Sequence, residues 1–223
     1  MTDAWTGDGE REDADVLEVE DDRLEEEEHV HELPLEEEPL IEEDEANDAP
    51  SVATARDHAG GELDIPGDVE VIEGMPDGAR RSIAVVAARF NGEITNRLLE
   101  SALDELDRRG VRREAIVVMP VPGAFELPIA AMALAKTRRY AAIVALGCVV
   151  RGETPHFEYV ASEAASGLQL AALETGVPVA FGVLTVDSVE QAEVRVEKGA
   201  EAVRTALEMA DAFKQLRATV AAR

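Results

Sequence analysis

Cysteine is nearly absent from this chain of 223 residues, which contains only Cys148. One cysteine excludes an intrachain disulfide, and its position after an apolar run, with no base beside it, is typical of a small buried residue. The first residues show no basic and apolar leader pattern, and no apolar run approaches the roughly 20 residues that span a bilayer. We therefore expect a cytoplasmic protein with no membrane partner.

Aromatic and basic residues are also scarce. The aromatic content is 4%, and 21 basic residues face 48 acidic ones, for a formal net charge of -27. Nucleic-acid binding requires a basic footprint, so this composition argues against it. The charge is uneven: residues 1–75 hold 29 acidic and 3 basic residues, which leaves 19 acidic and 18 basic residues in the rest.

The acidic part of the chain contains runs such as DDRLEEEEHVHELPLEEEPLIEEDE. Its carboxylates repel one another, and its few apolar groups cannot offset the entropy of ordering the backbone. We expect residues 1–68 to form a disordered acidic tail. His29 and His31 within it lack a further ligand at metal spacing, so we expect no metal site there.

The apolar remainder, residues 69–217, has the length of one domain and precedes a short C-terminal tail at 218–223. Its apolar runs each lead into a pattern of helical period. Four such βα units in series predict a four-stranded parallel sheet with helices on both faces, a three-layer α/β/α fold. The expected strands are 82–88, 115–121, 140–147 and 178–186.

Capping residues set the expected helix boundaries. Pro128 must fall in the first turn of its helix. Thr154 is expected to cap the following helix, with Pro155 at the first helical position. Ser188 and Gln191 form a capping-box pattern ahead of one long final helix.

The stretch VEVIEG at 69–74 precedes the first βα unit and is too short to pair reliably within the sheet. Two interpretations remain open. The segment is an edge strand donated to a neighbouring subunit, or it is the end of the acidic tail.

Unusual residues follow or end every expected strand. Open α/β sheets hold their ligands at the carboxyl ends of their strands, so the coincidence predicts one site there. The stretches are ARFNG (88–92), PVPGAFELP (120–128), GCVVRGETPH (147–156) and FGVLTVD (181–187).

Gly152, Glu153 and Thr154 stand just before a helix whose free N–H groups and dipole favour an anion such as phosphate. The same dipole disfavours an imidazolium in the first turn, which makes His156 a candidate general base. The alternative is an ordinary helix start with a surface histidine. Phe90 and Phe181 are either core residues or ring faces for a flat heterocycle.

Together these stretches resemble the 6,7-dimethyl-8-ribityllumazine synthase family. The resemblance runs from Val69 to Leu216 and rests on ARFNGEIT, PVPGAFELP, LGCVVRGETPHFEYV, TGVPVAFGVLT and EKGAEAVRTALEM, in that order. It implies a flavodoxin-like fold and a transferase of riboflavin biosynthesis that needs no cofactor and no metal. The implied reaction condenses 5-amino-6-ribitylaminouracil with 3,4-dihydroxy-2-butanone 4-phosphate and releases phosphate and water.

The resemblance also implies residue roles, with His156 as the acid/base group and Arg195 as a second catalytic residue at the phosphate. Arg195 and Lys198 are three positions apart here, whereas most family members have a longer segment between them, so a surface role for Arg195 stays open. The implied substrate-binding residues are Phe90, Asn91, Gly123, Ala124, Phe125, Glu126, Cys148, Val149, Val150, Gly152, Glu153, Thr154, Phe181 and Lys198.

Family members place their sites between adjacent subunits of a pentamer, with the residue matching Phe181 supplied by a neighbour. The resemblance thus implies a pentamer, or a multiple of pentamers up to an icosahedral shell, and riboflavin synthase as a candidate partner. One alternative is a shell or scaffold protein whose acidic tail recruits cargo. Another is a non-catalytic flavodoxin-like FMN binder, although no separate pocket for its ring can be named.

Overall fold

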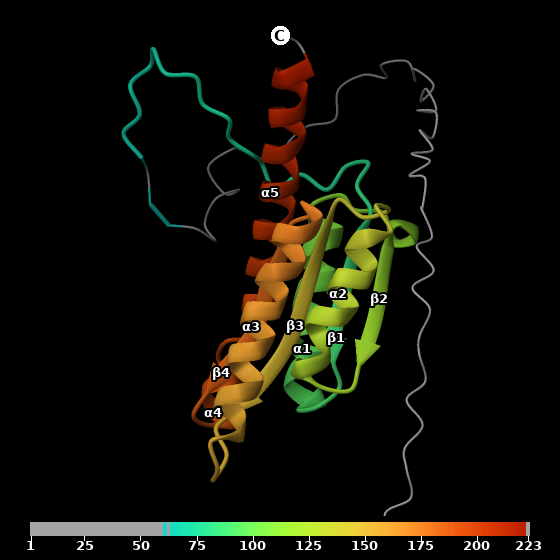
Figure 1. Cartoon of the computed structure of the whole chain (residues 1–223), viewed down its shortest axis with the longest axis vertical. Coiled ribbons are helices and arrows are strands. Elements are labelled where there is room, and N and C mark those ends of the chain that lie inside the picture. The colour runs from blue at the N-terminus through green and yellow to red at the C-terminus, as the bar shows by residue number, and fades with distance from the viewer. Residues whose placement is uncertain (1–59, 62, 222–223) are drawn as a thin grey trace, which may run out of the picture. The chain divides into compact units, whose positions relative to one another are not determined.

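The computed structural model describes residues 60–61 and 63–221 (Figure 1). The expected acidic tail therefore lies almost entirely outside the described residues, as do His29 and His31. No helix in the described part of the chain is long and apolar enough to cross a membrane.

A single parallel sheet forms the middle layer of the fold, in the order β2-β1-β3-β4. This is the flavodoxin-like order, and it confirms the predicted four-stranded α/β fold. β1 is paired on both sides, with Ile83 opposite Ile116 of β2 and Ala142 of β3. The strands are β1 (Ile83–Ala88), β2 (Ile116–Val121), β3 (Ala142–Val150) and β4 (Val179–Val186).

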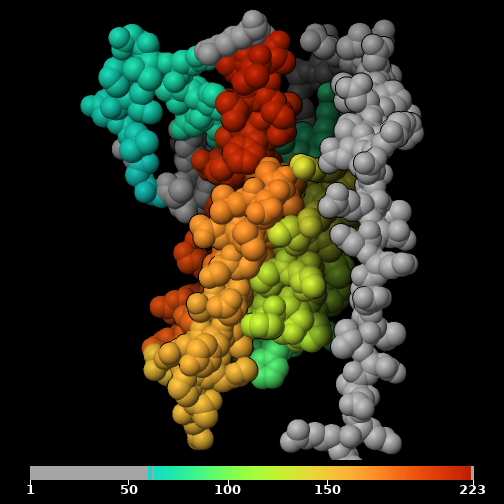
Figure 2. All heavy atoms as spheres, viewed as in Figure 1, coloured from blue at the N-terminus to red at the C-terminus, as the bar shows by residue number. Residues whose placement is uncertain are grey.

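Helices cover both faces of this sheet, with α2 and α3 on one face and α1 and α5 on the other (Figure 1). Figure 2 shows the face formed by α3 (orange) and α2 (yellow-green). The α-helices are α1 (Gly92–Arg108), α2 (Leu127–Lys136), α3 (His156–Thr175), α4 (Val189–Glu193) and α5 (Lys198–Ala221), and short 3-10 turns, η2 and η3, span Arg113–Ala115 and Ala124–Glu126.

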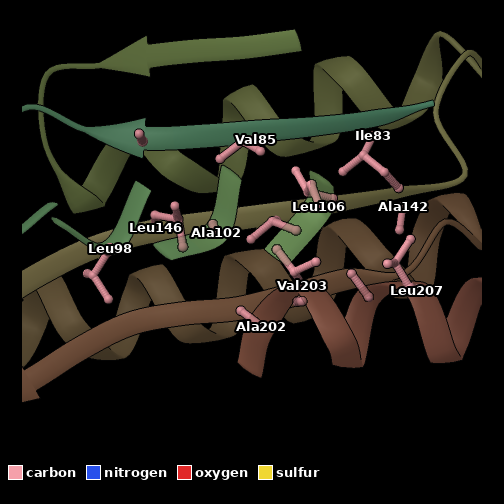
Figure 3. Close-up of a cluster of buried hydrophobic side chains, with 14 of the residues drawn as sticks. Ile83, Val85, Leu98, Ala102, Leu106, Ala142, Leu146, Ala202, Val203 and Leu207 are labelled. Atoms are coloured by element: carbon pink, nitrogen blue, oxygen red, sulfur yellow. The ribbon is translucent and has the colours of Figure 1, made fainter. Parts of the chain in front are cut away.

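Alternating strand residues build one apolar core on each side of the sheet. Ile83 and Val85 of β1 point toward α1 and α5, and Leu106 of α1 and Leu207 of α5 belong to the same buried cluster (Figure 3). Ala84 and its neighbours at even positions face α2 and α3 instead. All six residues of β1 are buried, as a central strand covered on both faces requires.

Two predicted boundaries around the third strand are wrong. β3 continues through Val150, because its last residues stay paired with β4 up to the Val150–Val186 register. Thr154 is not the cap of α3: Pro155 holds the cap position without a side-chain bond, and its carbonyl accepts the N–H of Glu158 at 3.0 Å. The φ of Pro155, -64°, is helical but its ψ of 0° is not, so α3 begins one residue later than expected.

The predicted single final helix is wrong as well. Ser188 caps α4 as expected, with its Oγ accepting from the N–H of Gln191, but α4 ends at Glu193 and α5 begins after a turn at 194–197. α5 starts where it meets α1, since a Cβ on Gly199 would lie 2.1 Å from the carbonyl oxygen of Leu98. α5 then runs to Ala221, so residues 218–221 are helical.

The segment at 69–74 forms no strand in the described chain. It runs beside the last turns of α5, where Gln215 donates its Nε2–H to the carbonyl of Glu73 at 2.8 Å and Asp211 accepts from the N–H of Met75 at 3.1 Å. Val71 is half exposed. Donation of this segment to a neighbouring subunit stays a prediction.

Candidate active site

A cavity of about 630 Å³ opens at the carboxyl ends of β1, β2 and β3. This is the edge at which the sequence predicts the ligand, next to the point where the strand order reverses between β1 and β3. The cavity is lined by Phe90, Asn91, Pro122, Gly123, Ala124, Phe125, Glu126, Cys148, Val149, Val150, Gly152, Thr154, His156, Phe157, Tyr159 and Val160.

The turn after β1 presents an aromatic ring to this cavity. The N–H of Phe90 donates to the carbonyl of Pro122 at 3.0 Å, which fixes the turn to the end of β2. The Phe90 side chain is 72% exposed, although a phenyl ring normally belongs in the core. Of the two interpretations of Phe90, the structure supports a ring face open to a ligand.

Asn91 follows in the left-handed conformation, with φ of 53°, which asparagine tolerates better than most residues. Its Nδ2–H donates to the carbonyl of Cys148 at 2.9 Å. The side chain thus bridges the ends of β1 and β3, and its Oδ1 atom is left to accept from a ligand.

The β2–α2 connection supplies a tight loop. The N–H of Gly123 donates to Oε2 of Glu126 at 2.9 Å, and the N–H of Glu126 donates back to the carbonyl of Gly123 at 3.3 Å. The Glu126 carboxylate is therefore held by the loop, at the last residue of η3 and the cap position of α2. Pro128 lies in the first turn of α2, as predicted.

The β3–α3 connection supplies an open loop and a histidine. A Cβ built on Gly152 would meet no atom within 4 Å, so this backbone is approachable from the cavity. His156 is the first residue of α3, and within the described residues its imidazole has no hydrogen-bond or ion-pair partner. The geometry leaves the imidazole available to a bound molecule.

Cys148 contributes through its backbone. The thiol is buried in the core on the α1 and α5 side, and burial raises its pKa. A buried thiol with a raised pKa is a poor nucleophile, which agrees with its interpretation as a core residue.

The sequence analysis missed four lining residues, three of which lie on the first turns of α3. Tyr159 is three residues after His156 and 69% exposed, so the two side chains share one helix face. Phe157 carries the Arg151 guanidinium 4.8 Å from its ring centroid. Helical spacing from His156 would have found them. The fourth, Pro122, is part of the β2–α2 loop.

Four predicted residues do not line the cavity of this chain. Glu153 is exposed in the β3–α3 loop. Phe181 is the third residue of β4 and therefore near its amino end, which corrects the expected position near the carboxyl end. Its side chain is 48% exposed.

The other two lie around the turn before α5. Arg195 donates to the carbonyl of Gln191 at 2.6 Å, and Lys198 pairs with Glu201 at 2.5 Å. Gln191 also accepts the N–H of Asp187 through Oε1 at 3.0 Å, and Asp187 pairs with Arg151 at 2.6 Å. A chain of contacts thus connects Arg195 to the β3–α3 loop.

Metal-ligating side chains are dispersed in the described part of the chain, where no group of three or more His, Cys, Asp or Glu residues could hold a metal ion.

Comparison with known proteins agrees with this geometry. Residues 80–214 match the family model of 6,7-dimethyl-8-ribityllumazine synthase. Proteins named 6,7-dimethyl-8-ribityllumazine synthase from Yersinia pestis (strain Pestoides F) and Yersinia pseudotuberculosis (serotype O:1b, strain IP 31758) are each 50% identical over 155 residues, which covers 67% of this chain and 99% of theirs. The chain belongs to the 6,7-dimethyl-8-ribityllumazine synthase family.

Proposed function

We propose that the chain is a lumazine synthase, a transferase of riboflavin biosynthesis that condenses 5-amino-6-ribitylaminouracil with 3,4-dihydroxy-2-butanone 4-phosphate. The observation that carries the proposal is the meeting, in one cavity, of the exposed Phe90 ring, the open backbone at Gly152 and the unpaired His156 imidazole. These supply a stacking face, a phosphate cradle and a proton carrier.

The pyrimidine ring stacks on Phe90, since flat heterocycles favour offset contact with an aromatic face. The ribityl hydroxyls bind the loop at 123–126 and the free Oδ1 of Asn91, whose amide is held by Cys148. Phe125, 58% exposed at the rim, covers the ribityl chain.

The phosphate binds at 152–154, where the N–H groups before α3 and the helix dipole favour an anion. The resemblance gives Arg195 a phosphate-binding role, and the contacts of Gln191 with Asp187, and of Asp187 with Arg151, link its segment to the β3–α3 loop. Lys198, the first residue of α5, is the second candidate cation.

Catalysis then follows from placement. The uracil 5-amino group adds to the ketone carbon and water leaves, giving an imine. A proton then leaves the hydroxyl-bearing carbon beside the imine as the C–O bond to phosphate breaks, and the resulting enol takes up a proton on its terminal carbon to become a ketone. The ribitylamino nitrogen closes the ring on this new ketone with loss of a second water. Holding the two substrates side by side lowers the activation free energy by up to about 7–11 kcal/mol. His156 moves protons to and from the leaving oxygens, for roughly 10²-fold or more.

A pentamer completes the site by bringing Phe181 of a neighbouring subunit over the substrate ring. Exposed apolar residues support such an assembly, because monomers rarely leave many of them in water. Val117, Val118 and Met119 of the edge strand β2 are each more than a third exposed, as is Phe181 on the opposite edge. The number of pentamers and binding to riboflavin synthase stay predictions.

The test is formation of the fluorescent lumazine from the two substrates by wild type, Arg195→Ala and the control Arg112→Ala, all in the same oligomeric state. We expect turnover in wild type, a raised KM for the phosphate substrate in Arg195→Ala, and no change in the control, which removes an exposed arginine just before η2. A folded oligomer without turnover would overturn the function. An unchanged Arg195→Ala would overturn only the role of Arg195.

A further inference from the structure

A second cavity, of about 360 Å³, lies at the opposite end of the sheet from the candidate active site. Its walls include Ser82, Ala141 and Pro178, the residues that lead into β1, β3 and β4. The reaction proposed for the first cavity does not involve this second cavity.

Arginine dominates this cleft. Arg80 and Arg81 come from the segment before β1, Arg138 and Arg139 from the α2–β3 connection, and Arg217 from α5. No Asp or Glu is among the lining residues. Five guanidinium groups from three separate segments therefore converge in a protein whose net charge is -27.

Two of the five arginines have partners within the fold, which is enough to explain their presence. Arg81 pairs with Asp211 at 2.5 Å and is nearly buried, and Arg138 donates to the carbonyl of Thr175 at 2.7 Å, at the end of α3. The side chains of Arg80, Arg139 and Arg217 have no ion-pair partner in the part of the chain that the structure describes. These three guanidinium groups are therefore available to an anion in the cavity.

The backbone conformation supports a functional role for the cleft. Three non-glycine residues of the described chain have positive φ: Asn91 at the candidate active site, and Arg80 at 60° and Arg138 at 58° here. The left-handed conformation costs roughly 1–2 kcal/mol for a residue with a Cβ, and such costs gather at functional sites.

We propose that this arginine cleft binds a small ligand that carries phosphate groups. A guanidinium group can donate two parallel hydrogen bonds to a phosphate group. Each phosphate carries about 1.5–2 negative charges. Two or three phosphates therefore match the charge of the cluster better than single carboxylates do. The volume fits a small molecule. Long polyanions such as nucleic acids are disfavoured by the negative charge of the whole chain. The ring of Tyr140 lines one wall and offers an apolar face to the rest of the ligand.

Arginine footprinting on the full-length protein tests the site. The rate of phenylglyoxal modification is measured for each arginine by mass spectrometry, with and without inorganic tripolyphosphate at constant ionic strength. We expect at least several-fold protection of Arg139 and Arg217, and none of Arg112 and Arg113, which are exposed and outside the cleft. Protection of Arg151 or Arg195 reports the candidate active site separately.

Calorimetric titration with tripolyphosphate then compares Arg139→Ala/Arg217→Ala with the matched pair Arg112→Ala/Arg113→Ala. The proposal expects at least tenfold weaker binding at the cleft in the first variant only. It is overturned by equal protection of all arginines, by no protection, or by citrate protecting Arg139 and Arg217 as well as tripolyphosphate does, since that would identify a carboxylate site.

Discussion

The side-chain amide of Asn91 donates to the carbonyl of Cys148 across 57 positions of sequence, at 2.9 Å. The bond ties the turn after β1 to the end of β3, the two strands between which the sheet reverses its order. Asn91 has the left-handed conformation, and the Phe90 ring beside it is exposed. The bond therefore fixes one side of the turn that carries Phe90.

Substitution of Asn91 separates its two contributions. Asn91→Gly keeps the left-handed turn but loses the bond, whereas Asn91→Ala also places a Cβ in a conformation that costs roughly 1–2 kcal/mol. We expect both variants to raise KM for the pyrimidine substrate, and Asn91→Ala to be the less stable by about 1 kcal/mol. Steady-state kinetics and urea unfolding measure this; equal stability of the two would contradict the conformational argument.

Replacement of His156 tests its role as proton carrier. His156→Ala should lower kcat by roughly 10²-fold or more with little change in KM, because the imidazole acts in the reaction and not in binding. Added imidazole should restore part of kcat. Wild-type kcat in the variant would show that the imidazole carries no proton.

Much of the fold was predictable, because the alternation of apolar runs with helical periods specifies a parallel sheet. The meeting of residues from 88–92, 120–128 and 147–156 in one cavity followed from the same topology, whereas the fourth predicted stretch, 181–187, does not line that cavity. Gly176 ends α3 in the left-handed conformation, as glycine at a helix end commonly does.

The features that could not be predicted from the sequence depend on contacts between distant segments. The break between α4 and α5 is set by the approach of Gly199 to Leu98, and the length of β3 by its pairing with β4. The arginine cleft draws on three segments, and no local motif brings them together. Phe181 differs from these cases, because the expected strand at 178–186 already placed it near the amino end and only its assignment to the carboxyl end was wrong.

A buried carboxylate joins α1 to α5. Glu105 is 2% exposed and contacts Arg109 at 2.8 Å and Arg204 at 3.3 Å, with Arg108 at 3.1 Å. Burial alone would raise the pKa of Glu105, but the hydrogen bond from Arg109 and the charges of the three arginines outweigh it, so the pKa lies below its ordinary value. The group therefore stabilises the fold above its unfolded pKa, and this contribution is lost as the pH falls through the folded pKa.

Glu105→Gln should accordingly lower the free energy of unfolding by about 1–3 kcal/mol near neutral pH, because the arginines lose their counter-charge. The gap to wild type should narrow as the pH falls below the unfolded pKa and through the lowered folded pKa of Glu105, because both side chains are then neutral. Urea unfolding at fixed protein concentration, repeated across the pH range, measures this difference in the free energy of unfolding. The control is Glu114→Gln, an exposed partner of Arg112. A gap that widens on acidification would contradict the lowered pKa.

The most direct test of the central claim, a lumazine synthase site shared between subunits, is complementation. Phe90→Ala and Phe181→Ala subunits are each assembled alone and then co-assembled in equal amounts, and lumazine formation per subunit is measured. We predict near-inactive single variants and recovery of about a quarter of wild-type activity in the mixture, because that fraction of interfaces combines two intact aromatic rings. A mixture no more active than its components would contradict a shared site, and undiminished activity in both single variants would contradict the aromatic clamp itself.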